Sequence, residues 1–283
     1  MKIIECPRDA MQGLHDFIPT EQKIKYINQL LKVGFDTLDM GSFVSPKAIP
    51  QMRDTQEVIK NLDLSHSDTK LLTIVGNSRG AKEATQFDEV HYLGFPFSIS
   101  DTFQKRNINS TIQDSFHRAE EILNCCVIGN KELVVYISMA FGNPYNDPWD
   151  ADIVLEWAHK LHNELGVDII SLSDTIGVAN PETIDYLFTS LIPELPQVEF
   201  GAHLHTTPDT WKEKVHAAVN AGCERFDGAF KGFGGCPMAK DDLTGNMPTE
   251  NLISYFNEKK MDIGLDMDAV QSSLQMTTEI FPL

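Results

Sequence analysis

Residues 133–205 decide the fold, because strand-like and helix-like segments alternate along them without interruption. The segments read LVVYISMA (133–140), ADIVLEWAHKLHNEL (151–165), DIISL (168–172), PETIDYLFTSL (181–191) and EFGAHLH (199–205). The first, third and fifth are short apolar runs typical of buried strands, whereas the second and fourth carry apolar residues at helical spacing. Strands that alternate strictly with helices must run parallel, so this stretch predicts three parallel strands.

The same alternation extends toward both ends of the chain. Further strands are expected over Lys2–Cys6, Phe35–Met40, Leu71–Val75, Val90–Gly94 and Glu224–Asp227, and further helices over Thr20–Gly34, Ile49–Leu62, Ala81–Phe87, Ser110–Cys126, Thr210–Ala221 and from Thr249. A closed (β/α)₈ barrel has about eight such units and typically needs ~250 residues, which fits this chain. An open doubly wound sheet competes, but no GxGxxG follows the first strand. We therefore predict one TIM-barrel domain over residues 1–283.

Composition restricts the classes of partner. The chain has 23 Lys and Arg against 41 Asp and Glu, a formal net charge of −18, so we expect neither nucleic acid nor a membrane as a partner. No apolar run approaches the ~20 residues of a membrane span, and the N-terminus has no targeting pattern. The 5 cysteines are irregularly spaced, which argues against a disulfide framework. We expect a soluble, cytoplasmic protein.

Polar residues gather where strands end, which is where a TIM barrel places its active site. His203 and His205 stand two apart on an expected strand, so both imidazoles point to one face and could share a metal ion. Local hydrogen bonding would explain this pair equally well. Arg8 and Asp9 follow the first strand, with Gln12 close by. They could supply an oxyanion contact and an oxygen ligand, or form a solvated ion pair.

A glycine-rich loop follows the last expected strand and reads FKGFGGCPMA (230–239). A long loop inside a compact domain is more often a lid than a spacer, although a plain connection also needs glycine for its turns. Cys236 lies in this predicted lid. A cysteine there could donate or accept a proton once water is excluded.

Several motifs in a fixed order carry a resemblance to a known family. They are PRDAMQG (7–13), SFVSPKAIPQM (42–52), QKRNINSTIQDSF (104–116), SLSDTIGVANP (171–181), HLH (203–205) and GFGGCPMA (232–239) followed by GN (245–246). From Pro7 to about Glu250 the chain closely resembles the 3-hydroxy-3-methylglutaryl-CoA (HMG-CoA) lyase family. This family belongs to the DRE-TIM metallolyase superfamily, which also contains Claisen-condensing synthases and carboxyltransferase domains.

The resemblance implies a divalent metal, Mg²⁺ or Mn²⁺, at the mouth of the barrel. By the matching motifs its ligands would be Asp9, His203, His205 and Asn246. Two imidazoles with two oxygens suit a metal that keeps open positions for substrate oxygens, and they would not suit a closed structural zinc site.

The resemblance also implies a reaction, the retro-Claisen cleavage of HMG-CoA, or of a close hydroxyacyl-CoA, to acetyl-CoA and acetoacetate. Arg8 would stabilise the enolate oxygen of the thioester, Cys236 would transfer a proton at C2, and Asp9 would double as a proton carrier. The implied catalytic set is Arg8, Asp9, Asp39, His203 and Cys236, and the implied substrate-binding set is Arg8, Gln12, Ser42, Asn107, Tyr136 and Thr175. The family further suggests a homodimer and a place in leucine degradation.

The chain departs from the family pattern at three points. Asp39 stands where the family has glutamate, Thr206 stands where it has aspartate, and Gly13-Leu14 replace a polar pair. A carboxylate drawn back by ~1 Å can cost ~100-fold in rate, so these changes bear on the exact substrate more than on the fold.

Two other functions stay open on the sequence. One is a Claisen-condensing synthase of the isopropylmalate or citramalate type, against which the SFVSPK and GGCP segments speak. The other is a barrel that binds an acyl-CoA without catalysis, against which the complete set of site residues speaks. Because the thioester is itself anionic, we expect a local positive rim, with Lys47, Lys105, Arg106 and Lys231 as candidates.

Overall fold

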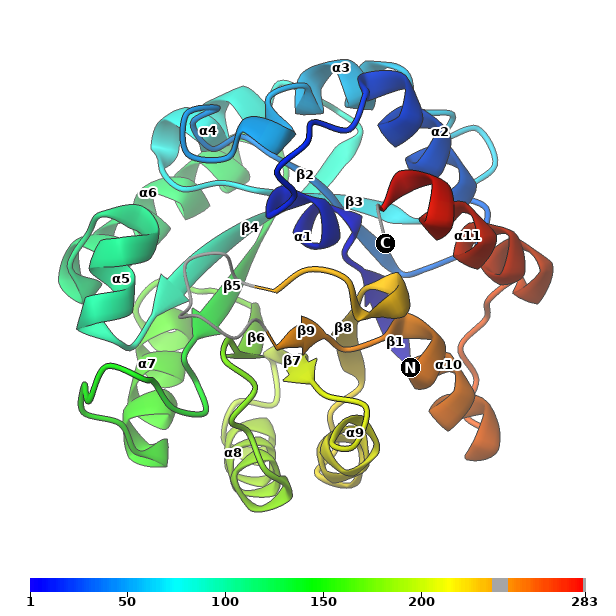
Figure 1. Ribbon diagram of the computed structural model, residues 1–283. Helices are drawn as coiled ribbons and strands as arrows, with labels where there is room; N and C mark the ends of the chain where they lie inside the picture. Colours follow the sequence, from blue (N-terminus) through cyan, green and yellow to red (C-terminus); the bar gives the residue numbers. More distant parts are fainter. Residues whose placement is uncertain (236–243, 282–283) are drawn as a thin grey trace.

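Eight parallel strands close into a barrel in the computed structural model, which describes residues 1–235 and 244–281 (Figure 1). The strands are β1 (Lys2–Glu5), β2 (Thr37–Ser42), β3 (Lys70–Ile74), β4 (Val90–Ser98), β5 (Glu132–Ser138), β6 (Ile169–Asp174), β7 (Glu199–Thr206) and β8 (Arg225–Gly228). Each pairs with the next along the chain, and β1 pairs with β8 to complete the ring. The predicted (β/α)₈ barrel is therefore confirmed.

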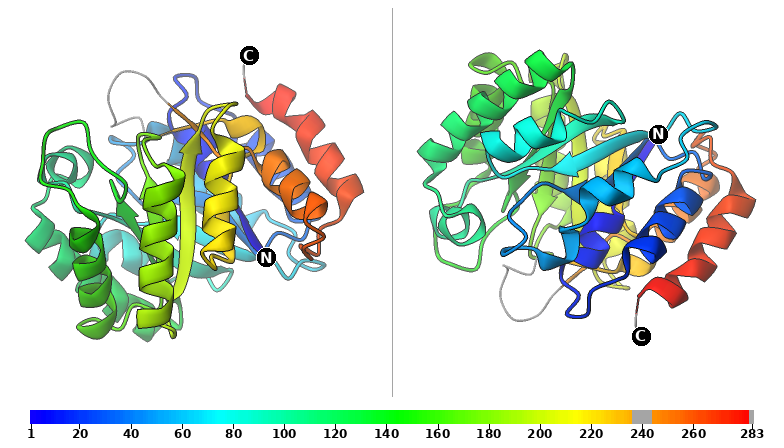
Figure 2. Two further views of the ribbon diagram at one scale, coloured as in Figure 1. Left: turned by 90° about the horizontal axis from the view of Figure 1, so that it is seen from below. Right: turned by 90° about the horizontal axis from the view of Figure 1, so that it is seen from above.

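Helices cover the outside of the barrel, as the two turned views show (Figure 2). The helices of the described chain are α1 (Pro7–Gln12), which lies over the barrel mouth, α2 (Thr20–Leu30), α3 (Thr55–Lys60), α4 (Ser78–Ala84), α5 (Asp101–Ile108), α6 (Ile112–Gly129), α7 (Ala151–Asn163), α8 (Pro181–Glu194), α9 (Trp211–Asn220), α10 (Thr249–Glu258) and α11 (Met267–Ile280), with 3₁₀ turns η1 (Pro50–Met52) and η2 (Phe230–Gly232). Across the described ranges no helix is long and apolar enough to cross a membrane. The main apolar core lies between the strands and these helices, and a smaller apolar cluster fills part of the barrel interior.

One expected helix is broken in the structure. The segment 49–62 forms η1 and then α3, because groups from α2 bind the backbone and side chains between them. Lys23 donates to the Gln51 carbonyl and to Asp54 Oδ1, the latter at 2.7 Å, and Thr20 donates to Asp54 Oδ2 at 2.8 Å. These bonds fix a turn where the apolar pattern predicts a continuous helix.

Two short elements that the pattern did not predict carry site residues. Helix α1 begins directly after β1, with Pro7 in its first turn, where the missing proline N–H costs no hydrogen bond. Strand β9 (Gly245–Asn246) pairs antiparallel with the end of β7. Both elements lie at the carboxyl ends of the barrel strands.

Candidate active site

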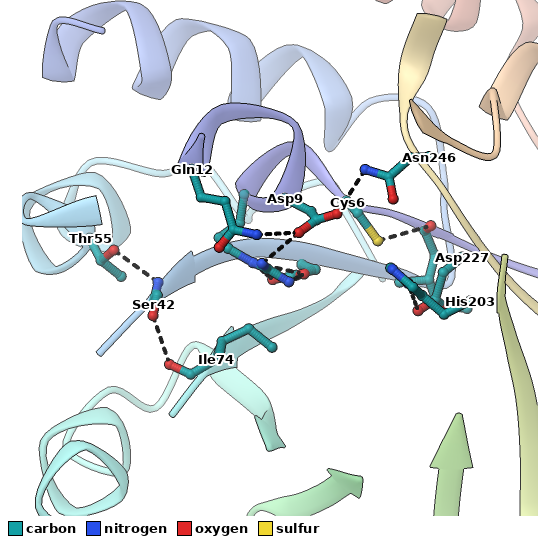
Figure 3. Close-up of polar contacts among 12 residues, drawn as sticks. Cys6, Asp9, Gln12, Ser42, Thr55, Ile74, His203, Asp227 and Asn246 are labelled. Carbon is teal, nitrogen blue, oxygen red and sulfur yellow. Dashed lines mark hydrogen bonds and ion pairs between the residues drawn. The ribbon is translucent and has the colours of Figure 1, made fainter. Parts of the chain in front are cut away.

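The four predicted metal ligands come together at the mouth of the barrel. One ligand atom from each of Asp9, His203 and His205 lies within 4.8 Å of the other two. The register of β9 sets Asn246 opposite His205, and Asn246 Nδ2 donates to Asp9 Oδ2 at 2.7 Å. In Figure 3 Asp9 lies between Gln12 and Asn246 and is bonded to both.

The chemistry of these donors fits a divalent cation. Burial opposes the charge of Asp9, but Arg8 and His203 outweigh it, so the pKa of Asp9 is lowered and the carboxylate stays ionised. Burial and the neighbouring His203 lower the pKa of His205 to about 4, so this ring is neutral. Its Nδ1 is buried and has no hydrogen-bond partner in the described part of the chain. An unpartnered imidazole nitrogen beside a carboxylate is an arrangement that a metal ion would complete.

Asp227 is a site residue that the sequence motifs did not reveal. It lies one residue before the end of β8, is 2% exposed, and its Oδ2 lies 3.0 Å from His203 Nδ1. Burial opposes the charge of His203, but the hydrogen bond and the negative charge of Asp227 outweigh it and raise the pKa of His203. A carboxylate on one ring nitrogen fixes the tautomer and leaves Nε2 to a metal. The available signal was an acid at the carboxyl end of a barrel strand.

Arg8 is held by two carboxylates. Its Nε donates to Asp39 Oδ1 and Oδ2 at 3.1 and 3.0 Å, its Nη2 also donates to Asp39, and its Nη1 donates to Asp9 Oδ1 at 2.9 Å. Burial raises the pKa of Asp39 to about 6, although Arg8 acts in the opposite direction. Asp39 is 1% exposed and does not line the pocket. It is therefore placed to orient Arg8, not to touch a substrate.

A pocket with a cavity volume of about 170 Å³ opens over these groups. Its walls include every predicted substrate-binding residue, namely Arg8, Gln12, Ser42, Asn107, Tyr136 and Thr175. The Tyr136 hydroxyl is buried and has no partner among the described residues. Two other hydroxyls serve the fold, since Ser42 Oγ donates to the Ile74 carbonyl at 3.1 Å and Thr175 Oγ1 accepts from the Met139 N–H at 2.9 Å. Figure 3 shows the Ser42 contacts.

The predicted catalytic Cys236 lies outside the described residues. The residues on either side of that segment contact the site. A Cβ on Gly234 would lie 2.7 Å from the Asp9 carbonyl oxygen, and its φ of +93° also requires glycine. Thr244 Oγ1 donates to the Ile176 carbonyl at 3.3 Å. The glycine-rich segment thus starts beside the predicted ligands and ends on the loop after β6.

Comparisons with known proteins identify the family that the chain matches. Residues 2–276 match the family model described as HMGL-like. The chain is 32% identical over 274 residues to the cytoplasmic 3-hydroxy-3-methylglutaryl-CoA lyase of Rattus norvegicus, covering 96% of this chain and 79% of the relative. It is 31% identical to the hydroxymethylglutaryl-CoA lyase YngG of Bacillus subtilis, covering 96% and 90%.

Solved structures give the same result. An HMG-CoA lyase from Acenitobacter baumannii, determined in complex with coenzyme A and 3-methylmalate, matches with a TM-score of 0.90 and 31% identity, over 99% of this chain and 90% of that one. The HMG-CoA lyase of Pseudomonas aeruginosa matches with a TM-score of 0.91 and 29% identity, over 100% and 93%.

Proposed function

We propose a reaction on the premise that the chain belongs to the HMGL-like family, which makes it a carbon–carbon lyase. The reaction is a metal-dependent cleavage of the C2–C3 bond of HMG-CoA, or of a close hydroxyacyl-CoA, to acetyl-CoA and acetoacetate. The observation that carries the proposal is the convergence of Asp9, His203 and His205 beside Arg8 in the floor of one pocket.

The cofactor would be Mg²⁺ or Mn²⁺, held by Asp9, His203, His205 and Asn246. When bound, it would act as a Lewis acid that lowers the pKa of the substrate's C3 hydroxyl. The unpartnered Nδ1 of His205 and the low pKa of Asp9 support this assignment.

The residues of the chain would divide the remaining work. Asp9 would take the proton of the C3 hydroxyl, whose oxygen then forms the ketone as the C2–C3 bond breaks. The electron pair of that bond leaves an enolate on the thioester, and the Arg8 guanidinium would stabilise its oxygen. Because two carboxylates already fix Arg8, no reorganisation is needed when this charge develops. Cys236 would then deliver a proton to C2.

The coenzyme A part of the substrate would approach over α5 and the loop after β2. Lys47 and Arg106 directly precede Ala48 and Asn107, which line the pocket, and this supports part of the expected positive rim. From the resemblance alone we also propose a homodimer, a cytoplasmic location and a role in leucine degradation.

The test is to incubate the purified protein with HMG-CoA and Mg²⁺ or Mn²⁺ and to assay acetyl-CoA and acetoacetate. We expect cleavage that a chelator stops and added metal restores. His203→Ala should not recover with metal, and Cys236→Ser should lose ~10²–10⁴-fold in rate while still binding metal.

Each opposite result has a definite meaning. Cleavage of another hydroxyacyl-CoA in place of HMG-CoA would refute the substrate. Full activity in both His203→Ala and Cys236→Ser would refute the mechanism. Net condensation of an acyl-CoA with a keto acid would favour a synthase.

A further inference from the structure

Lys214 of α9 carries a buried ammonium group that the proposed mechanism does not use. Its side chain is 1% exposed, and its Nζ donates to Asp174 Oδ2 at 2.7 Å, to the His205 carbonyl at 2.8 Å and to the Gly177 carbonyl at 3.0 Å. An ammonium has three N–H donors, so each has an acceptor. A buried charge is costly unless it is fully paired in this way.

The three acceptors lie on separate parts of the site. Asp174 ends β6, Gly177 belongs to the loop that follows, and His205 is a predicted metal ligand near the end of β7. Asp174 Oδ1 also accepts from the Ala179 N–H at 3.0 Å, and this bond joins the two ends of the loop. One cation therefore joins a metal ligand to the loop that includes Thr175, a pocket wall residue.

The same loop supports the end of the glycine-rich segment. A Cβ on Gly177 would lie 2.6 Å from Thr244 Cγ2, and Thr244 Oγ1 donates to the Ile176 carbonyl. Any shift of residues 175–179 would therefore move the contact surface of Thr244 as well as the pocket wall.

The side chain of the residue after His205 does not hold this end of β7 by a hydrogen bond among the described residues. Thr206, which stands where the family pattern has aspartate, has a buried Oγ1 without a hydrogen-bond partner in the described ranges. The carbonyl of His205 accepts from Lys214 instead.

We propose that Lys214 is a positioning residue, whose ammonium fixes the backbone of His205 and of the loop 175–179 so that metal ligand and pocket wall keep one arrangement. This inference rests on the proposed metal site. Outer partners of metal ligands commonly change metal affinity or activity by ~10–100-fold when removed.

The chain contains a matched control pair. Lys23 Nζ donates to Asp54 Oδ1 at 2.7 Å, the two side chains are 4% and 10% exposed, and Lys23 also bonds the Gln51 carbonyl. Neither Lys23, Asp54 nor Gln51 lines the pocket. This pair has the chemistry of the Lys214–Asp174 pair without its contacts to the site.

The experiment compares Lys214→Met/Asp174→Asn with Lys23→Met/Asp54→Asn. Neutralising both partners avoids an unpaired buried charge. For each variant the Kd for Mn²⁺ is measured without substrate, followed by kcat, KM and the urea midpoint. We expect the Lys214 double variant to raise the Mn²⁺ Kd by ~10–100-fold and to lower kcat more than it raises KM, while the control keeps the wild-type Kd.

Equal Mn²⁺ affinity in the two double variants would overturn the proposal, because both would then report only lost packing. Lys214→Gln/Asp174→Asn keeps amide N–H donors for the His205 carbonyl without an unpaired buried carboxylate, and it covers the case in which the methionine variant does not fold. We expect it to raise the Kd by a smaller factor, and a wild-type Kd in this variant would equally overturn the proposal. Wild-type protein that binds Mn²⁺ but cleaves no thioester would refute the proposed function alone, whereas wild-type protein that binds no Mn²⁺ would refute both.

Discussion

The interior of the barrel has two unlike halves. Around β1, β2, β7 and β8 the site groups are the buried Arg8, Asp9, Asp39, His205 and Asp227 and the partly buried His203. Along β3 to β6 the interior holds Leu72, Ile74, Tyr92, Val134, Tyr136 and Ile169. Each carboxylate of this set contacts a cation or an imidazole, so the arrangement of these side chains depends on individual bonds. In the second half the side chains mainly fill volume, apart from Ile74 and Tyr136, which line the pocket, so we expect the others to tolerate conservative exchange.

The largest effect should come from Arg8→Met, which removes the cation between Asp39 and Asp9. We expect a loss of ~10³-fold in cleavage rate and of ~3–5 kcal/mol in the free energy of unfolding, because two buried carboxylates lose their partner. Thioester assays and urea unfolding measure the two losses. Arg8→Met/Asp39→Leu should regain stability but not activity. A rate within tenfold of wild type in Arg8→Met would contradict the importance of paired charge in this half.

A smaller loss is expected from Asp227→Asn, which keeps the shape of the side chain but removes the charge that holds His203. The Mn²⁺ Kd should rise by ~10–100-fold, because the ring loses its fixed tautomer and orientation. Isothermal titration with Mn²⁺ measures this change. Asp168→Asn is the control, since Asp168 is exposed and lies outside the pocket. Unchanged affinity in Asp227→Asn would mean that this hydrogen bond is not needed for metal binding.

Glu5 differs from the paired buried acids of the site, because it forms no ion pair among the described residues. It is 1% exposed, accepts from the Phe230 N–H at 3.0 Å and from Thr249 Oγ1, and burial raises its pKa from 4.5 to about 8. Between these values the native state keeps a proton that the unfolded chain has lost. The contribution of Glu5 to the free energy of unfolding is therefore fully present below pH 4.5. It decreases by at most ~1.4 kcal/mol for each unit that the pH rises, and it is lost above about pH 8.

Glu5→Gln should remove this dependence, because its amide stays neutral and can bond both partners. Urea unfolding of both proteins at several pH values between 5 and 8 provides the measurement. Parallel curves for the two proteins would show that Glu5 does not titrate in this window.

The smallest effect is expected in the apolar half. Ile169→Val removes one methylene group and should cost ~0.5–1.5 kcal/mol in the free energy of unfolding. The Mn²⁺ Kd and kcat should stay at wild-type values, because Ile169 does not line the pocket. A tenfold change in either constant would show that the two halves are coupled.

The barrel could be predicted from the sequence because its signal is repeated along the chain. Each strand is an apolar run, each helix has its own periodicity, and the alternation leaves few topologies. The ligand residues were predicted by motifs that the resemblance supplied, and the structure brings Asp9, His203, His205 and Asn246 together.

What the sequence did not predict depends on contacts between distant segments. Six residues are too few to show a helical period, so α1 was not recognised. Asp227 is a single acid at a strand end and has no motif around it. Lys214 lies in a helix where a lysine normally indicates a solvated face, yet three acceptors from β6, its loop and β7 bury it. Only the assembled barrel shows these partners.

The short ladder between β9 and β7 fixes the place of one candidate metal ligand. It sets Asn246 opposite His205 by backbone pairing, so the position of Asn246 does not depend on the length of chain between Gly235 and Thr244. Insertions or deletions in that stretch would leave the ladder, and with it the placement of Asn246 opposite His205, unchanged. The number of residues between the HLH and GN motifs can therefore differ among relatives of this barrel while Asn246 keeps its place beside the candidate metal ligands.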